Sequence, residues 1–355
     1  MNIEKLNDVN RIFYNFKDKE NGSLRMDRNE KVEDWDIEHF NLIFNDIKSY
    51  EITGYPPNNF DKLYQKYASY LNISKNNIYI TCGADDAIRE FFIMYCIGDK
   101  KICINTENYG MYNVFSNCLI LDFYEIPYII DLNYENICKL DKNKLNKIIP
   151  NMDVIFFTNP NQLSNNDISL EEMDNLCKKY SEKIFFIDET YYGFGHFTFI
   201  SLVKKHKNIF ICRSASKTFG LASLRVGSLI AHEDSIKPFI SFAPVYKINV
   251  FSAKIMEYFL DNLKIVNSYN NKVIEGRSYF VKVLKEKGYK VNSTSCICIF
   301  ILFENELERN NVVNKLESNK IYVSKRNYNY DSKIYYFIRL TCAPLKYMNK
   351  LIKYF

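Results

Sequence analysis

Residues 213–227, RSASKTFGLASLRVG, decide the fold of this chain. The five residues before them, NIFIC, are apolar and predict a short buried strand that delivers the segment into a pocket. Lys217 follows two small hydroxyl residues, Ser214 and Ser216, and Arg225 lies further along the segment. A lysine held among groups that bind a phosphate is what Schiff-base chemistry with a phosphorylated aldehyde requires. Two hydroxyls and a forked guanidinium suit such a dianion.

The pattern SxSKxxGLAxLRxG resembles the lysine segment of fold-type I pyridoxal-phosphate (PLP) enzymes. It is most similar to the histidinol-phosphate aminotransferase branch, which also includes small decarboxylases of phosphorylated amino acids. The resemblance implies pyridoxal 5'-phosphate as the cofactor, carried by Lys217 and bound by Ser214, Ser216 and Arg225. It also implies an α/β PLP-dependent transferase (aspartate aminotransferase-like) fold, with a large, mainly parallel seven-stranded sheet and a small C-terminal α+β domain.

The order of predicted elements agrees with that fold. Strands alternate with helices through most of residues 75–250, which predicts a mainly parallel sheet covered on both faces. From about residue 250 a long, densely charged helical region begins, which we expect to break near Gly276 and Gly288. We therefore expect an N-terminal arm at 1–45, a large PLP-binding domain at 46–250 and a small domain at 251–355.

Two further segments are candidates for the cofactor's phosphate. Gly83, Ala84 and Asp85 follow a predicted strand, and a glycine at a strand-to-helix turn leaves backbone amides free for an anion. Asp85 is also a good helix cap, which is the simpler alternative. Tyr55, in GYPP, matches a family tyrosine that reaches the phosphate of the neighbouring subunit. This match implies a homodimer with shared active sites.

Four residues are candidates for contacts with the cofactor ring. Tyr109, in ENYGMY, resembles the tyrosine of PTYGMY that stacks on the ring, although Glu107-Asn108 replaces Pro-Thr and an ordinary core tyrosine is possible. Asn159 and Tyr191 match the family's donors to the phenolic oxygen. Asp188, at the end of a predicted strand, matches the carboxylate that keeps the pyridine nitrogen protonated, or else caps a helix. After Asn159 the chain departs from NPNNPTG, because QLSN replaces NPTG at residues 162–165.

Three residues are candidates for contacts with the substrate. Arg339 lies in an otherwise apolar run, where a lone guanidinium is costly without an anionic partner. It resembles the family's arginine for the α-carboxylate. Asn29, in DRNE, resembles the DxNEN-type signature of an arm that crosses to the partner subunit and helps to cover the substrate pocket. Lys325 and Arg326 lie where the family has a basic residue for a distal phosphate. Arg326 is the candidate, Lys325 stays open as the alternative, and a solvated loop is equally possible for either.

These matches predict a PLP-dependent aminotransferase of the class I/II type. Its expected substrate is a phosphorylated or phosphonated amino compound, with an amino donor and a 2-oxo acid acceptor. Lys217 is the expected general base and acid, aided by Asp188 and Tyr191. One alternative is a decarboxylase of a phosphorylated amino acid on the same scaffold. Another is a PLP-binding or PLP-free relative without catalytic activity.

Composition excludes several other classes. The net charge of +5 is spread along 355 residues and no basic run indicates nucleic-acid binding. The 10 cysteines are scattered and form no CxxC pair or Cys/His cluster, so we expect no metal site. The N-terminal residues have no apolar signal region, and no stretch reaches membrane-spanning length. A reducing cytoplasm is therefore the expected location.

Overall fold

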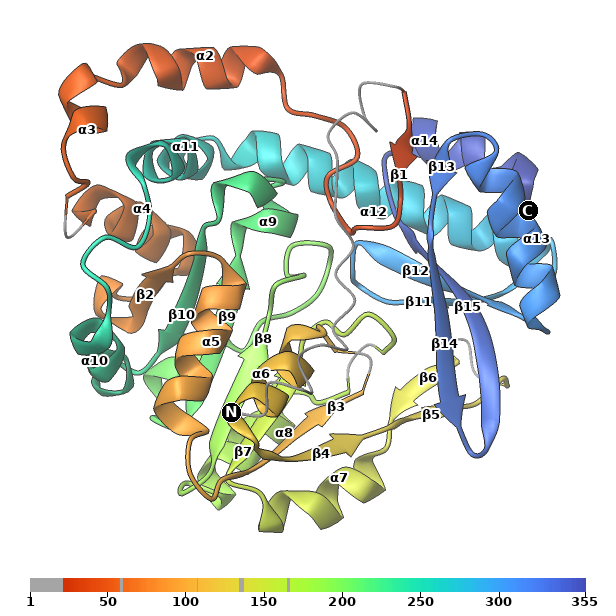
Figure 1. Cartoon of the computed structure of the whole chain (residues 1–355), viewed down its shortest axis with the longest axis horizontal. Coiled ribbons are helices and arrows are strands. Elements are labelled where there is room, and N and C mark those ends of the chain that lie inside the picture. The colour runs from red at the N-terminus through yellow and green to blue at the C-terminus, as the bar shows by residue number, and fades with distance from the viewer. Residues whose placement is uncertain (1–21, 58–59, 107, 134–136, 165–166) are drawn as a thin grey trace.

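The computed structural model describes residues 22–57, 60–106, 108–133, 137–164 and 167–355. The first part of the predicted arm, Glu107 and Asn165 lie outside these residues. In the described part the elements form a large layered unit and a smaller one beside it (Figure 1). No described helix combines the length and the apolar composition that a bilayer crossing needs.

The large unit is built on a seven-stranded sheet whose middle strands are the predicted ones. Five neighbouring strands, from β9 to β4, are parallel, and β10 runs antiparallel to both of its neighbours. The mainly parallel sheet is therefore confirmed. In spatial order the strands are β2 (Ile78–Thr81), β10 (Gly227–Ala231), β9 (Ile209–Ser214), β8 (Ile184–Asp188), β7 (Val154–Thr158), β3 (Lys101–Asn105) and β4 (Asp122–Ile126).

The central strands are apolar on both faces because helices cover both faces (Figure 1). Alternate side chains point to opposite sides. Phe156, Phe186 and Phe210 join a core cluster with α5, where the rings of Phe91 and Phe186 lie 4.5 Å apart. Their sequence neighbours join a second cluster with residues of α4, α8 and α11. Two buried faces hold the parallel strands in register, so their carboxyl ends form one shared edge.

The remaining elements of the large unit surround this sheet. The helices are α2 (Ile37–Asp46), α3 (Ser49–Thr53), α4 (Asp61–Leu71), α5 (Ala84–Tyr95), α6 (Met111–Leu119), α7 (Lys142–Ile148), α8 (Leu170–Lys179), α9 (Ala215–Thr218), α10 (Glu233–Phe242) and α11 (Val250–Asp261), and the short strands are β5 (Tyr128–Ile130) and β6 (Cys138–Leu140). Short 3-10 turns lie at Lys75–Asn77, Ile149–Asn151, Ile200–Lys204 and Ala222–Leu224.

The small unit is an antiparallel sheet packed on helices, as the α+β prediction requires. Its strands, in spatial order, are β11 (Lys290–Ser293), β12 (Cys298–Phe303), β15 (Lys333–Thr341) and β14 (Ser324–Tyr330), and its helices are α12 (Leu263–Glu286), α13 (Glu306–Glu317) and α14 (Leu345–Leu351), followed by a 3-10 turn at Ile352–Tyr354. The boundary at residue 250 stays a prediction.

The expected helix break near Gly276 is wrong. Helix α12 runs through Gly276 without interruption and ends just before Gly288. A Cβ at Gly276 would overlap the carbonyl oxygen of Ala343 and would lie 3.0 Å from the amide of Leu345. The glycine therefore allows α12 to approach the start of α14 closely, and its role is packing rather than termination.

The arm follows a course that the sequence did not predict. Residues 22–35, here called the strap, begin with β1 (Leu24–Arg25), which pairs in parallel with β13 (Ile321–Tyr322) of the small unit. The indole of Trp35 then donates to the carbonyl of Phe219, two residues beyond the predicted catalytic lysine, at 2.9 Å. The strap therefore contacts the pocket of its own chain, and the crossing of the arm to the partner subunit stays a prediction.

Candidate active site

Lys217 lies at the edge where the parallel strands end. It belongs to α9, directly after β9, and the hydroxyl of Ser214 caps this short helix by accepting the amide of Ser216 at 3.1 Å. The lysine amine donates to the carbonyl of Arg28 in the strap at 3.3 Å. Burial, aided by the charge of Arg339, lowers the pKa of Lys217 to about 8. The amine therefore loses its proton more readily than a surface lysine does.

Asp188 is the last residue of β8, on the strand adjacent to β9. It is buried, and its carboxylate accepts the hydroxyl of Tyr112 at 3.0 Å and the amide of Thr190 at 3.0 Å. Burial raises the pKa of Asp188, although both hydrogen bonds oppose this effect. Sequence reasoning missed Tyr112. The available signal was its position one helical turn after Tyr109, at the start of α6.

The predicted phosphate turn lies beside the predicted arginine. Gly83 has a φ of +81° and precedes α5, and Arg225 pairs with Asp85 at 2.8 Å. A Cβ at Gly83 would lie 2.5 Å from the guanidinium of Arg225, and one at Gly227 would lie 2.7 Å from the amide of Ala84. The two glycines thus keep the helix N-terminus open beside a cation, as a site for an anion requires.

Tyr109 reaches the same place from the start of α6. Its hydroxyl is hydrogen-bonded to Asp85, and the charges of Arg225 and Asp188 act on it. Burial and Asp85 both raise the pKa of Tyr109, so the phenol stays protonated. The structure therefore brings Tyr109 to the predicted phosphate turn, although the side chain is still 45% exposed.

Asn29 and Arg339 meet at a residue that the sequence left unassigned, Gln162, and Asn29 also contacts Tyr191. The amide oxygen of Gln162 accepts Nη1 of Arg339 at 3.0 Å and Nδ2 of Asn29 at 3.3 Å. Nδ2 of Asn29 also donates to the hydroxyl of Tyr191 at 2.9 Å. Residues far apart in the chain thus form one hydrogen-bonded group. Arg339 and Lys217 are close enough for their charges to interact.

Comparison with known proteins agrees with this geometry. Residues 39–355 match the family model described as aminotransferase class I and II. The chain belongs to the aminotransferase class I and II family. It is 25% identical over 284 residues to the histidinol-phosphate aminotransferase of Thermotoga sp. (strain RQ2), covering 79% of this chain and 80% of that protein. The same enzyme of Buchnera aphidicola subsp. Schlechtendalia chinensis is 30% identical over 249 residues, 68% of each chain.

Solved structures share the fold of this aminotransferase. The histidinol-phosphate aminotransferase of Sinorhizobium meliloti, solved with pyridoxal-5'-phosphate, superimposes with a TM-score of 0.81 at 16% identity, covering 96% of this chain and 94% of that one. The histidinol-phosphate aminotransferase of Clostridium acetobutylicum gives a TM-score of 0.78 at 20% identity, covering 93% and 97%.

The residues of this aminotransferase fit the same cofactor. A helix N-terminus that has no room for side chains, with Arg225 beside it, suits the phosphate. Asp188 suits a protonated ring nitrogen, and Lys217 has the lowered pKa that a Schiff-base amine needs. In the described ranges no group of three or more His, Cys, Asp or Glu residues is placed to hold a metal ion.

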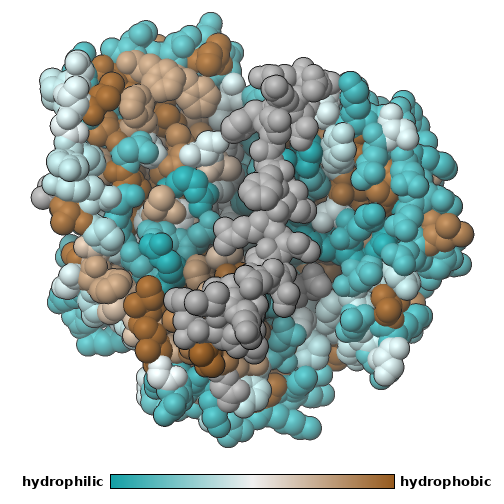
Figure 2. Space-filling model, in the orientation of Figure 1, coloured by the Kyte–Doolittle hydropathy of each residue, from teal (hydrophilic) through white to brown (hydrophobic). Residues whose placement is uncertain are grey.

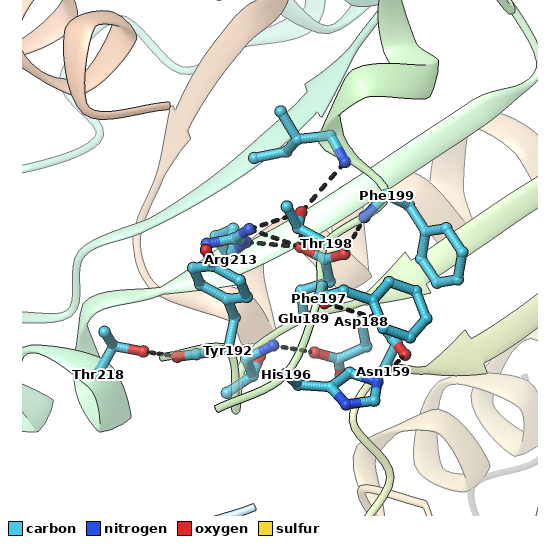
Figure 3. Close-up of polar contacts among 12 residues, drawn as sticks. Asn159, Asp188, Glu189, Tyr192, His196, Phe197, Thr198, Phe199, Arg213 and Thr218 are labelled. Carbon is cyan, nitrogen blue, oxygen red and sulfur yellow. Dashed lines mark hydrogen bonds and ion pairs between the residues drawn. The ribbon is translucent and has the colours of Figure 1, made fainter. Parts of the chain in front are cut away.

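Asn159 is hydrogen-bonded to two residues of the segment that follows β8. Its Nδ2 donates to the carbonyl of Phe197 at 3.3 Å, and its Oδ1 lies 2.7 Å from Nε2 of His196 (Figure 3). Because a carbonyl can only accept, the amide orientation is fixed, and His196 must donate from Nε2. Burial lowers the pKa of His196 to about 4, so this ring is neutral at physiological pH. The structure therefore joins Asn159 to His196, and its contact with the cofactor's phenolic oxygen stays a prediction.

A buried ion pair supports both catalytic strand ends. Arg213 precedes Ser214 and Glu189 follows Asp188, and their side chains meet at 2.7 Å (Figure 3). Glu189 also accepts from Thr198 at 2.7 Å, while the guanidinium lies 3.6 Å from the ring centre of Tyr192. This pair was also missed by sequence reasoning, because nothing in the chain indicates that the two side chains face each other.

The last two predicted residues lie on outer elements. Tyr55 is 82% exposed and stacks on Tyr246, with ring centres 4.4 Å apart. Arg326 is opposite Phe337 in the pairing of β14 with β15, whereas Lys325 is opposite Ile338. Because side chains alternate along a strand, Arg326 shares a sheet face with Arg339, and Lys325 lies on the other face. The strand register therefore favours Arg326.

Proposed function

We propose that this aminotransferase acts on a phosphorylated amino compound of the histidinol-phosphate type, with a 2-oxo acid as the acceptor. One observation carries the proposal. Arg339 is held at both terminal nitrogens by neutral oxygens, those of Gln162 and of the Asp27 carbonyl, and its buried Nε has no partner among the described residues. A guanidinium prepared in this way, near the reactive amine, suits a substrate carboxylate.

The cofactor is pyridoxal 5'-phosphate, and its ring supplies an electron sink for the substrate's α-carbon. The proposed role of Lys217 is to carry the α-proton, which its lowered pKa supports. Asp188 holds a proton on the ring nitrogen, and Tyr191 donates to the phenolic oxygen. We propose that Asn159, whose Oδ1 is held by His196, also donates to that oxygen.

The proposed phosphate ligands come from three segments. Gly83, Ala84 and Asp85 provide the helix N-terminus, and the charge of Arg225 balances the phosphate. The buried hydroxyls of Ser214 and Ser216 lie on the lysine segment itself. We place the ring of Tyr109 against the cofactor ring, because its hydroxyl already reaches Asp85.

A distal anion on the substrate is the second part of the proposal. Arg326 is exposed, and it shares a sheet face with Arg339. Diagonal neighbours on paired strands lie roughly 7–8 Å apart at their Cα atoms, which long side chains can span. One compound could therefore place a carboxylate on Arg339 and a phosphate on Arg326. Asn29 completes this wall from the strap, where it supports Arg339 through Gln162.

We also propose a homodimer. Large apolar side chains are exposed on α2 and α3 and around Tyr55, and Figure 2 shows apolar residues gathered over that corner of the molecule. The exposed residues are Ile37, Leu42, Phe44, Tyr50, Ile52, Tyr55, Val245 and Tyr246. A contiguous apolar surface of this kind is typical of an interface. A second copy covering it would bring Tyr55 toward the partner's phosphate site.

Mixed dimers test this arrangement. Lys217→Ala and Tyr55→Ala proteins should each be weakly active, and light scattering should report dimers for both. If Tyr55 serves the partner's site, a mixture refolded together regains activity, because one of the two sites in a mixed dimer has both residues. A monomer in solution, or no regain in a proven mixed dimer, would contradict shared sites.

The ten cysteines support a reducing cytoplasm as the location. All of them are free thiols in the described residues, and Cys82 is exposed. An exposed free thiol persists where the surroundings are reducing.

A substrate assay decides the proposed activity. The purified protein with added PLP should show the cofactor's visible absorption, which Lys217→Ala abolishes. Adding histidinol phosphate or O-phosphoserine without an acceptor should bleach this band once, and a 2-oxo acid should restore it. Continuous release of carbon dioxide without an acceptor would point to decarboxylation instead. If no phosphorylated amine changes the band, the proposed substrate class is wrong.

A further inference from the structure

Asn29 is placed so that every polar atom of its side chain is used. It is 1% exposed and has a φ of +55°. Its Oδ1 accepts the hydroxyl of Thr341 at 3.2 Å, and its backbone amide donates to the same hydroxyl at 3.0 Å. Its Nδ2 faces Tyr191 at 2.9 Å and Gln162 at 3.3 Å. A residue held this completely has little freedom to bind a substrate itself.

The direction of each hydrogen bond in this group follows from Arg339. A guanidinium only donates, so the atom of Gln162 that faces it must be the amide oxygen. An oxygen only accepts, so the atom of Asn29 that faces Gln162 must be Nδ2. The same Nδ2 faces Tyr191, and it has no lone pair to offer. The hydroxyl oxygen of Tyr191 therefore accepts from Asn29, and its own proton must point elsewhere.

We propose that Asn29 is a positioning residue that directs the hydroxyl proton of Tyr191 into the pocket, and that Arg339 sets this direction through Gln162. The inference rests on the proposed function, because the pocket is the place of the cofactor's phenolic oxygen. Burial keeps the phenol of Tyr191 protonated by raising its pKa, so it has a proton to donate. Arg339, which binds the substrate carboxylate in the proposed function, is thereby linked to Tyr191, which donates to the cofactor's phenolic oxygen.

The direction of this hydrogen bond should affect the absorption of the bound cofactor, and not only the binding of the substrate. A donor to the phenolic oxygen stabilises the anionic form of that oxygen and so lowers the pH at which the bound cofactor's absorption changes. If Tyr191 turned its proton toward residue 29 instead, that stabilisation would be lost. The pH midpoint of the visible band then rises by about one unit or more.

Asn29→Asp is the variant that reverses the donor and the acceptor in the hydrogen bond between residue 29 and Tyr191. Aspartate tolerates a positive φ, and the charge of Arg339 favours its ionised form. An ionised carboxylate only accepts, so Tyr191 would donate to it. Gln162→Glu is the matched control: it adds an equal charge, but its oxygens still accept from both Arg339 and Asn29, so the direction at Tyr191 is kept. Gln65→Glu, on the exposed face of α4, controls for charge at a distance.

A double-mutant cycle of Asn29→Asp with Tyr191→Phe separates the effect of the hydrogen-bond direction from the effect of the added charge. We expect Asn29→Asp to raise the midpoint of the band in the wild-type background, and to raise it only by the smaller effect of the added charge in the Tyr191→Phe background. Gln162→Glu should shift the midpoint less and should mainly raise KM, because it competes for Arg339. An equal shift from Asn29→Asp with and without the Tyr191 hydroxyl would overturn the inference.

A second readout needs no cofactor. Asn29→Asp sets a carboxylate oxygen against the amide oxygen of Gln162, so it should lower the melting temperature of the cofactor-free protein. In a Gln162→Ala background the two oxygens no longer face each other, so Asn29→Asp should lower the melting temperature by less. An unchanged loss in the two backgrounds would overturn the assigned bond directions. If the wild-type protein shows no cofactor band at all, the proposed function fails, and this measurement still decides the bond directions.

Discussion

The hydroxyl of Tyr112 donates to Oδ2 of Asp188 across 3.0 Å, and the two side chains are buried together. This bond joins the first turn of α6 to the end of β8. The carboxylate also accepts the amide of Thr190, so it is held from two directions. An acid that must face a ring nitrogen keeps one orientation only if its surroundings fix it.

Tyr112→Phe should weaken this support without removing any predicted ligand of the cofactor. A lost buried hydrogen bond costs about 1–3 kcal/mol, so kcat should fall by roughly 5- to 100-fold. The pKa of Asp188 should rise further, because the bond favours its charged form. Tyr95→Phe, at the end of the preceding helix α5, is the control. An unchanged pH profile and kcat would show that Asp188 needs no help from α6.

The lowered pKa of Lys217 predicts that this residue costs stability. The pKa is about 8 in the folded chain and 10.5 in the unfolded one, so between these values the unfolded chain binds more protons. Stability therefore rises with pH through this window, and below pH 8 the folded protein carries the full cost of a charged buried amine. Cofactor-free Lys217→Met should melt a few degrees (~2–4 °C) above wild type at pH 7.

The advantage of Lys217→Met should shrink as the pH approaches 10.5. Lys282→Met, at an exposed position on α12, should show no such trend. Melting curves by circular dichroism from pH 7 to pH 10 test both variants. A difference that does not depend on pH would mean that Lys217 is not destabilised by its surroundings.

Arg339 and Arg326 should bind different parts of the substrate, Arg339 the carboxylate and Arg326 the distal phosphate. Arg339→Lys removes the forked geometry and should raise KM by roughly 10- to 100-fold, as expected for one lost charged hydrogen bond. The effect should be equal for phosphorylated substrates and for analogues without phosphate. Arg326→Lys should raise KM only for the phosphorylated compounds. If Arg326→Lys affected both classes alike, the proposed distal phosphate site would be misplaced.

The buried pair of Glu189 and Arg213 should be costly to break from one side. Glu189→Gln or Arg213→Met alone leaves a buried charge without its partner and should cost about 3–5 kcal/mol of unfolding free energy. The double variant should recover much of this loss, because no unpaired charge remains. Urea denaturation measures all three proteins. Additive losses in the double variant would mean that the two side chains do not depend on each other.

Sequence reasoning did well where one local pattern carried the information. The apolar strands before Asp188 and Lys217 were placed to within two residues, because a strand buried on both faces is a short apolar run. It failed where the partner lay far along the chain. Gly276 was expected to end a helix, since nothing local reveals that the carbonyl of Ala343 comes close to it.

The carboxamides near the pocket show the same limit. The motif at Asn159 did not indicate His196 as its partner, and Gln162, in the loop that departs from the motif, contacts Arg339. A side chain that follows a tight turn cannot be assigned a direction from its type alone. The contacts of the strap with Gln162 and Tyr191 of its own chain were likewise not indicated by the sequence.

The sequence by itself indicated the buried strands and placed Lys217 and Asp188 at their ends, because each depends on hydrophobic runs and on chemistry carried within a few residues. The tertiary structure alone decided which polar groups face each other across the pocket. Asn29, Gln162 and Arg339 lie more than a hundred residues apart in the chain, and the direction of their hydrogen bonds exists only once folding places donors opposite acceptors.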